Sequence, residues 1–161
     1  MVEEKMALFL VQHGISAGKA VDLEKELTQQ GKIETERIAG LAKGYDIKVS
    51  KIIHSGKKRA EQTASIYHNA LSLTNPLEVV SGINPLDDVR PFATTIKPGP
   101  GLMVVGHMPF MQRLVSYLIT GSEDIQVYQF QNSGIVCLSA SEDVAGEFNW
   151  FIKWTLNPNI S

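Results

Sequence analysis

Two short apolar runs that each end beside a glycine and a histidine constrain the fold of this chain most strongly. They are residues 7–14, Ala-Leu-Phe-Leu-Val-Gln-His-Gly, and residues 102–107, Leu-Met-Val-Val-Gly-His. A short apolar run bounded by turn residues is typical of a strand that is buried on both faces of a parallel sheet. Ligands bind at the carboxyl edge of such a sheet, so the two runs predict His13 and His107 at one binding edge.

Each histidine taken alone also fits a core or turn residue that adjoins a glycine. A third segment is needed to favour a binding site over that interpretation. Residues 55–64, Ser-Gly-Lys-Lys-Arg-Ala-Glu-Gln-Thr-Ala, follow another apolar pair and begin a predicted helix. The free backbone N–H groups at the start of a helix bind anions, and Arg59 adds a guanidinium there. Two histidines and an arginine at one sheet edge indicate phosphate chemistry.

The rest of the pattern predicts a single α/β domain over residues 1–161. Apolar runs alternate with amphipathic segments, which is typical of a parallel sheet with helices on both faces. The strands expected in this part are 7–11, 49–53, 76–80 and 102–105. Helices are expected after Thr28, in the segment that residues 55–64 begin, after the turn residues of 82–91 and from about Pro109. Thr28 is the expected N-cap of the first helix, and Gly44 near its end is the expected left-handed residue. The apolar stripe of the first helix is expected at Ile38, Leu41, Ala42 and Tyr45, and one face of the second at Ala60, Thr63, Ala64, Tyr67 and Leu71. Residues 135–139 and 147–154 flank a turn-rich segment and predict an antiparallel hairpin at the edge of the sheet.

The charge composition argues against nucleic acids and anionic membranes as partners of this protein. The 161 residues include 15 Lys plus Arg and 17 Asp plus Glu, a net charge of −2, so no basic excess indicates nucleic acid or an anionic membrane. The lone cysteine, Cys137, lies in an apolar run and predicts a packing role. Residues 1–6 are too polar and too short for a signal peptide, so a cytoplasmic protein is expected, as a monomer or weak dimer.

Three segments in order, 10–14, 55–64 and 105–109, resemble the histidine phosphatase superfamily, which has the phosphoglycerate-mutase-like fold. Within it, residues 59–63, 106–109 and the late Phe-Asn-Trp of 148–150 are similar to the SixA-type phosphohistidine phosphatases. The resemblance implies a three-layer α/β/α fold with a mostly parallel sheet and a C-terminal antiparallel edge hairpin.

The resemblance also implies roles for individual residues. His13 would attack phosphorus and carry a phosphohistidine intermediate, which divides one hard displacement into two easier ones. Arg59 would hold phosphoryl oxygens through its planar fork, and His107 would face the same oxygens. Gln12 and Lys25 would complete the phosphate-binding set. No metal and no cofactor are implied.

The chain departs from the family pattern at two positions where the family has an arginine. Gln12 stands where the family has an arginine, and Lys25 stands where it has another arginine. Glutamine keeps an N–H donor without charge, and lysine is only a point charge. Lys19, Lys57 or Lys58 could compensate, although each also fits a solvated surface group.

Two further sets of side chains have two interpretations each. Asp87 and Asp88 could supply a general acid for the leaving group, but they also fit helix or turn caps. SixA-type members generally lack such an acid, which suits the high-energy P–N bond of phosphohistidine. His54 could line the pocket or pack at the end of a strand.

The sequence therefore predicts a metal-independent phosphatase that uses a phosphohistidine intermediate. Its substrate would be phosphohistidine in a protein, such as a histidine-phosphotransfer domain, or a small phosphorylated compound. The alternative is a phosphate-binding or phosphohistidine-binding module whose turnover is weakened or lost, because Gln12 replaces the family arginine.

Overall fold

The computed structural model describes residues 6–160; residues 1–5, on which the argument against a signal peptide mainly rests, and Ser161 lie outside the described residues. Its elements in chain order are β1 (Ala7–Gln12), α1 (Gln29–Gly44), β2 (Lys51–His54), α2 (Lys58–Ala70), β3 (Glu78–Val79), α3 (Val89–Ala93), β4 (Pro100–Gly106), α4 (Phe110–Thr120), β5 (Ile135–Glu142) and β6 (Phe148–Leu156). No described helix combines the length and the apolar character that crossing a membrane requires.

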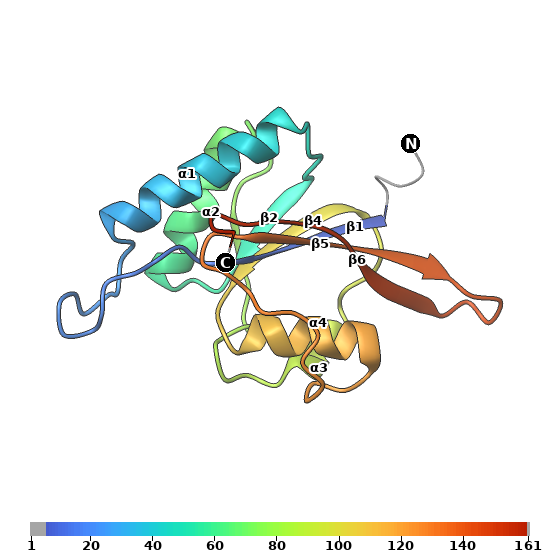
Figure 1. Ribbon diagram of the computed structural model, residues 1–161. Helices are drawn as coiled ribbons and strands as arrows, with labels where there is room; N and C mark the ends of the chain where they lie inside the picture. The colour runs from blue at the N-terminus through green and yellow to red at the C-terminus, as the bar shows by residue number, and fades with distance from the viewer. Residues whose placement is uncertain (1–5, 161) are drawn as a thin grey trace.

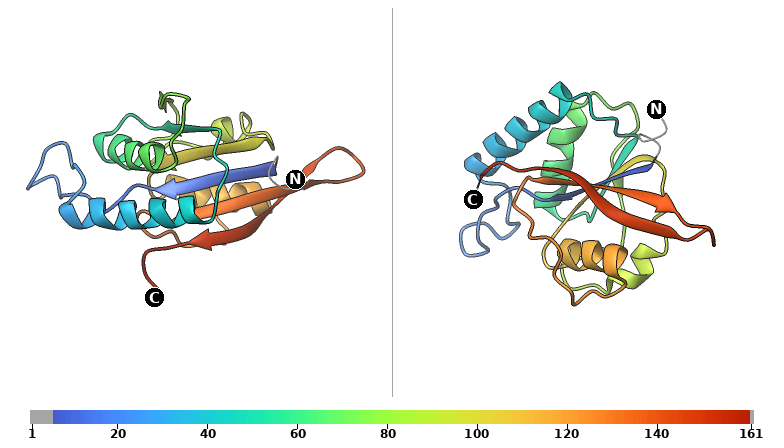
Figure 2. Two further views of the ribbon diagram at one scale, coloured as in Figure 1. Left: turned by 90° about the horizontal axis from the view of Figure 1, so that it is seen from above. Right: turned by 45° about the vertical axis from the view of Figure 1, so that its right-hand side comes forward.

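One six-stranded sheet organises the molecule, in the order β3-β2-β4-β1-β5-β6. The first four of these strands are parallel, whereas β5 runs antiparallel to β1 and β6 runs antiparallel to β5. The predicted parallel sheet with an edge hairpin is thereby confirmed. Figure 2 shows that the turn of this hairpin extends beyond the other strands, at the end of the molecule opposite the loop that precedes α1.

Helices cover both faces of the sheet and complete the three layers (Figure 1). Side chains alternate along a strand, so β1 contributes to both cores. Phe9 and Val11 pack with buried residues of α1 and α2, while Leu8 and Leu10 pack with buried residues of α3 and α4. Helices α1 and α2 therefore lie on one face, and α3 and α4 lie on the other.

The first helix differs from its prediction in which face it buries. The expected apolar stripe of Ile38, Leu41, Ala42 and Tyr45 is only half right, because Leu41 is 45% exposed and Tyr45 is 75% exposed. The buried face runs through Gly31, Thr35, Ile38 and Ala42 instead. Small residues dominate that face because α1 packs closely against its neighbours, so hydrophobicity alone misplaces it.

The prediction for the start of α1 is confirmed, whereas the prediction for its end is wrong. Thr28 is the predicted N-cap, and its hydroxyl accepts a hydrogen bond from the Gly31 N–H at 3.0 Å. The expected left-handed residue near the other end, Gly44, is instead the last residue of the helix, and Asp46 takes the positive φ of 58°. Aspartate tolerates that conformation because its short polar side chain forms local hydrogen bonds.

Candidate active site

The pairing of β1 with β4 brings the two predicted histidines together. Gln12, the last residue of β1, is paired with Gly106. The His13 N–H donates to the Gly106 carbonyl at 3.0 Å, so the hydrogen bonding between the two strands continues one residue beyond β1. The imidazole rings of His13 and His107 then lie with their centroids 5.1 Å apart. Two segments separated by more than ninety residues therefore meet at the carboxyl edge of the sheet.

The hydrogen bonds of His13 define which ring nitrogen is free to react. Nδ1 lies 2.7 Å from the Gly14 carbonyl, which can only accept, so Nδ1 carries the proton. Nε2 accepts a hydrogen bond from the Nε–H of Arg59 at 3.3 Å. The lone pair of Nε2 thus faces the guanidinium, where an anion bound by Arg59 would meet it.

Burial keeps His13 uncharged at neutral pH. Desolvation is the main cause that lowers its pKa from 6.5 to about 4, and the charges of Arg59 and Lys25 add to the effect. The hydrogen bond to the Gly14 carbonyl opposes it without reversing it. An imidazole must be unprotonated to act as a nucleophile, so the environment prepares His13 for that role.

This pKa predicts the acid limit of activity. Below about pH 4 the Nε2 lone pair becomes protonated, so kcat/KM should hold from neutral pH down to that region and then fall tenfold per pH unit. The profile is measured with an aryl phosphate and corrected for the ionisation of the substrate. Lys25→Gln should move the limit to higher pH because a cation is removed, while the exposed control Lys97→Gln should not. A limit near 6.5 would contradict this environment.

His107 is held by Ser55, a contact that the sequence did not reveal. Ser55 Oγ lies 2.6 Å from His107 Nε2 and accepts a hydrogen bond from the Lys57 N–H at 3.3 Å. The hydroxyl proton of Ser55 is therefore available for His107. The ring is only 1% exposed, and burial, with the charges of the site, lowers its pKa to about 3. Its Nδ1 has no hydrogen-bond partner among residues 6–160.

Backbone contacts fix the turn that carries His13. The Gly14 N–H donates to Thr63 Oγ1 at 2.9 Å, and the Thr63 hydroxyl donates to the Arg59 carbonyl at 2.8 Å. Asn132 Nδ2 donates to the His13 carbonyl at 2.9 Å. Thr63 was predicted only as part of a helix face and Asn132 not at all, because neither contact is local in sequence. Together they bind the His13 turn to α2 and to the segment before β5.

Gly14 itself is required by close packing. A Cβ atom at this position would lie 2.7 Å from Thr35 Oγ1, closer than side chains tolerate. The His-Gly pair that stood out in the sequence is therefore a histidine followed by a residue that lets the chain approach α1.

Arg59 lies in the first turn of α2, as the sequence predicts, and shares a surface hollow with four lysines. This hollow has a volume of about 560 Å³. Its lining residues are Lys19, Leu23, Glu24, Lys25, Gly56, Lys57, Lys58 and Arg59. The structure thus brings Lys25 to the same site as Arg59. Gln12 lies half-buried at the end of β1, next to His13.

The alternative roles of Asp87, Asp88 and His54 are not favoured by their contacts. Asp88 is the N-cap of α3, accepts from the Arg90 N–H at 3.0 Å and forms an ion pair with Arg90 at 2.9 Å. Asp87 accepts from the Asn84 N–H at 2.8 Å, which closes the preceding turn. His54 is buried in β2, and its Nδ1 accepts from the Gly56 N–H at 3.1 Å, as expected of a packed residue at a strand end.

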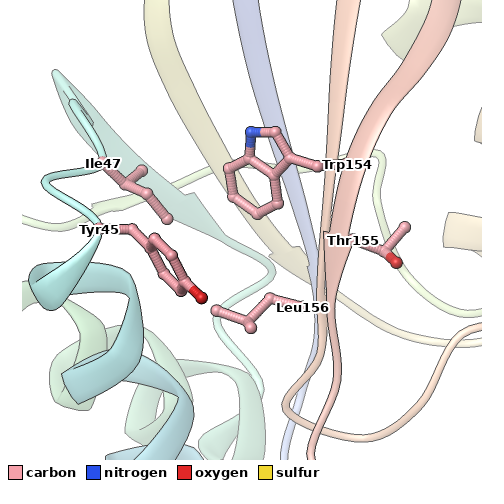
Figure 3. A pocket seen from close by; sticks show the side chains of 5 residues that line it. All are labelled: Tyr45, Ile47, Trp154, Thr155 and Leu156. Carbon is pink, nitrogen blue, oxygen red and sulfur yellow. The ribbon is translucent and has the colours of Figure 1, made fainter.

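A second hollow lies away from these residues, on the face covered by α1 and α2. It measures about 340 Å³ and is lined by Tyr45, Ile47, Trp154, Thr155 and Leu156. Figure 3 shows the side chains of Trp154 and Leu156 directed toward Ile47 and Tyr45, with Thr155 pointing away. This hollow offers no histidine, carboxylate or cation, so it does not compete with His13 as the site of phosphate chemistry. Cys137 is buried nearby, as its apolar run predicts, and burial raises its pKa to about 11.

The residues of the site do not form a recognisable metal centre. Within residues 6–160, no group of three or more histidine, cysteine, aspartate or glutamate side chains is close enough to hold a metal ion. The site places one uncharged ring nitrogen beside a guanidinium and a second, buried imidazole.

Comparison with known proteins agrees with this geometry. No protein-family model matches the chain. The phosphohistidine phosphatase SixA of Escherichia coli is 29% identical over 151 residues, which cover 90% of this chain and 92% of that protein. A solved structure of the protein histidine phosphatase SixA complexed with tungstate aligns with a TM-score of 0.77 and 26% identity, over 95% of this chain and 97% of that one.

More distant structures share the fold. A SixA-type protein of Agrobacterium tumefaciens aligns with a TM-score of 0.76 and 20% identity, over 96% of this chain and 99% of that one. A mycobacterial glucosyl-3-phosphoglycerate phosphatase aligns with a TM-score of 0.68 and 13% identity, over 92% and 98%. In sequence and fold the chain is therefore similar to the histidine phosphatase superfamily, and the SixA-type phosphohistidine phosphatases are among its relatives.

Proposed function

We propose that this protein is a phosphatase that forms a phosphohistidine intermediate on His13 and needs no metal ion. The observation that carries the proposal is the uncharged Nε2 of His13, which faces the guanidinium of Arg59 while His107 lies beside it. Each of the three groups has a distinct use toward a phosphoryl group.

The reaction proceeds in two displacements at phosphorus. His13 Nε2 forms a bond to phosphorus while the bond between phosphorus and the leaving group breaks, and the leaving group takes the bonding pair and a proton from solvent water. Water then attacks phosphorus and loses a proton to the solvent, the P–N bond breaks with its pair returning to His13 Nε2, and phosphate leaves. Charge on the phosphoryl oxygens is held by the fork of Arg59 and by the backbone N–H groups at the start of α2. Positioning and electrostatics therefore account for most of the catalysis.

Phosphohistidine in a protein is the preferred substrate, with a small phosphorylated compound as the other candidate. The caps made by Asp87 and Asp88 support this preference, because they occupy the carboxylates that could have served as a general acid. A phosphoramidate, with a high-energy P–N bond and an imidazole leaving group, depends least on such an acid. A phosphorylated histidine-phosphotransfer domain in the cytoplasm is a partner of this kind.

Phosphate release tests the proposal directly. Incubation with phosphorylated histidine-containing proteins, and separately with an aryl phosphate, should release inorganic phosphate at a rate that a chelator leaves unchanged. Vanadate should inhibit, because it adopts a five-coordinate geometry like that of the displacement at phosphorus. Activity that a chelator removes and a divalent cation restores would contradict metal independence.

Gln12, in place of the family arginine, is the basis of a second candidate, a phosphate-binding or phosphohistidine-binding module whose turnover is weakened or lost. A hydrogen bond to a charged group is worth about 1.5–3 kcal/mol, against about 0.5–1.5 kcal/mol for a neutral one. The glutamine therefore forfeits on the order of 1–2 kcal/mol of stabilisation relative to arginine, or about tenfold in rate at about 1.4 kcal/mol per decade. That loss predicts a slow enzyme, since Arg59 and both histidines remain.

Restoring the arginine separates the two candidates. Gln12→Arg should raise kcat/KM about tenfold, because a guanidinium would then stabilise charge on the phosphoryl oxygens. The measurement is steady-state phosphate release, with the exposed Gln29→Arg as a control of equal charge. An unchanged rate would mean that another cation, such as Lys25, already stabilises those oxygens. Inactivity of both proteins on every phosphorylated substrate would favour the binding module.

A further inference from the structure

The lysine-lined hollow beside Arg59 is much larger than one phosphoryl group needs. Its volume of about 560 Å³ lies in the range of sites that enclose a whole small molecule, whereas the proposed chemistry occupies only the end near Arg59. The remainder is lined by Lys19, Lys57 and Lys58 with a single carboxylate, Glu24. The hollow therefore has cations that the phosphatase reaction itself does not use.

These cations are also largely free of partners within the chain. Among the described residues, Lys19, Lys25 and Lys57 form no ion pair, and Lys58 has only an exposed contact with Glu61 at 3.6 Å. The whole chain carries a net charge of −2, so this concentration of positive charge is local. Unpaired like charges gathered in one hollow repel each other, and an anionic ligand relieves that repulsion.

The loop between β1 and α1 holds one wall of the hollow in place. It projects beyond the carboxyl edge of the sheet (Figure 1) and is pinned by a bridge between Ser16 and Leu27. The Leu27 N–H also donates to Gln62 Oε1 of α2 at 2.8 Å, and Asp22 accepts from the Glu26 N–H at 3.2 Å. The wall that carries Lys19 and Lys25 is therefore attached to the helix that carries Arg59.

The same loop presents apolar side chains beside the cations. Leu23 lines the hollow and is 83% exposed, and Val21 is 85% exposed. An anionic metabolite bound by the cations does not need the apolar side chain of Leu23, but a protein surface docked on the hollow would cover it. Apolar contact beside complementary charge is typical of a site that docks a protein.

From these observations we infer that the hollow is a docking site for acidic side chains that flank the phosphorylated residue of a protein substrate. Lys19, Lys57 and Lys58 then determine specificity, and Leu23 adds apolar contact at the rim. The inference rests on the proposed phosphatase function and adds to it the kind of surface that the enzyme selects. It also favours a protein over a small compound as the substrate.

Binding of unphosphorylated peptides tests the docking site without requiring turnover. Two labelled peptides with a central histidine are compared by fluorescence anisotropy, one with flanking glutamates and one with glutamines at the same positions. The protein should bind the glutamate peptide about tenfold more tightly at low salt, and the preference should shrink as salt screens the charges. The double variant K19E/K58E should lose the preference, while K43E/K97E, with the same net charge but exposed lysines outside the hollow, should keep it.

Measurement of turnover is the second part of the test of the docking site. With the two peptides phosphorylated on histidine, the ratio of their kcat/KM values should favour the glutamate peptide in the wild type and in K43E/K97E but not in K19E/K58E. Equal binding of the two peptides by the wild type, or an unchanged preference in K19E/K58E, would overturn the docking site. Absence of phosphate release from phosphoimidazole and both peptides would instead contradict the proposed function, with the anisotropy result still deciding on the docking site.

Discussion

Replacement of His13 by alanine should lower kcat/KM for phosphate release by on the order of 10⁴-fold or more, because the nucleophile of the first displacement is lost. The fold should survive, since among residues 6–160 the imidazole hydrogen-bonds only to Gly14 and Arg59. Steady-state phosphate release from an aryl phosphate measures the first effect, and a thermal unfolding curve measures the second.

His68→Ala is the matched control for this experiment. His68 lies on α2, and its Nε2 contacts the Asn75 carbonyl at 2.8 Å, so it should be dispensable for phosphate release. Full activity of the His13→Ala protein would remove His13 from the mechanism. If His68→Ala lost as much activity as His13→Ala, the loss would not be specific to position 13.

Arg59 should be the next most sensitive position. Arg59→Ala removes the donor that faces His13 Nε2 and the cation nearest the proposed phosphoryl group, so kcat/KM should fall about 10²–10³-fold. Arg59→Lys should recover only part of the loss, because a point charge cannot match two oxygens as a planar fork does.

The exposed Arg90 provides the control, since it forms an ion pair with Asp88 at the start of α3. Arg90→Lys should leave phosphate release unchanged. The contrast between Lys at position 59 and Lys at position 90 isolates the geometry of the guanidinium from its charge. Equal activity of Arg59→Lys and the wild type would mean that charge alone suffices at position 59.

The placement of the two histidines could be predicted because it depends on strand ends alone. An apolar run ending at Gly-His leaves its histidine at the carboxyl edge, and two parallel strands share that edge whatever their order in the sheet. The edge hairpin was predictable for a similar reason, since two β-rich runs around a turn pair locally. The cap at Thr28 followed from local chemistry as well.

The contacts that hold the site could not be predicted, because they join segments that are distant in sequence. Ser55 contacts His107 across 52 positions, and Asn132 contacts His13 across 119. Neither residue type is rare enough for its presence to indicate a partner. The buried face of α1 was misjudged for a related reason, since small residues such as Gly31 and Ala42 pack there while Leu41 remains exposed.

The lysines of the hollow could not be assigned to one site from the sequence either. In the sequence, Lys19 and Lys58 are separated by 39 positions and each fits a solvated surface residue. Only the attachment of the β1–α1 loop to α2 shows that they face one hollow with Arg59.

Trapping the phosphorylated enzyme tests the central claim most directly. The protein is mixed with a phosphorylated substrate, quenched in denaturant at alkaline pH, which preserves phosphohistidine, and mapped by mass spectrometry. One phosphoryl group should be found on His13 during turnover, decaying at the rate of phosphate release, and none on His107. Phosphate release without any label on His13, or with the label on another residue, would contradict the account.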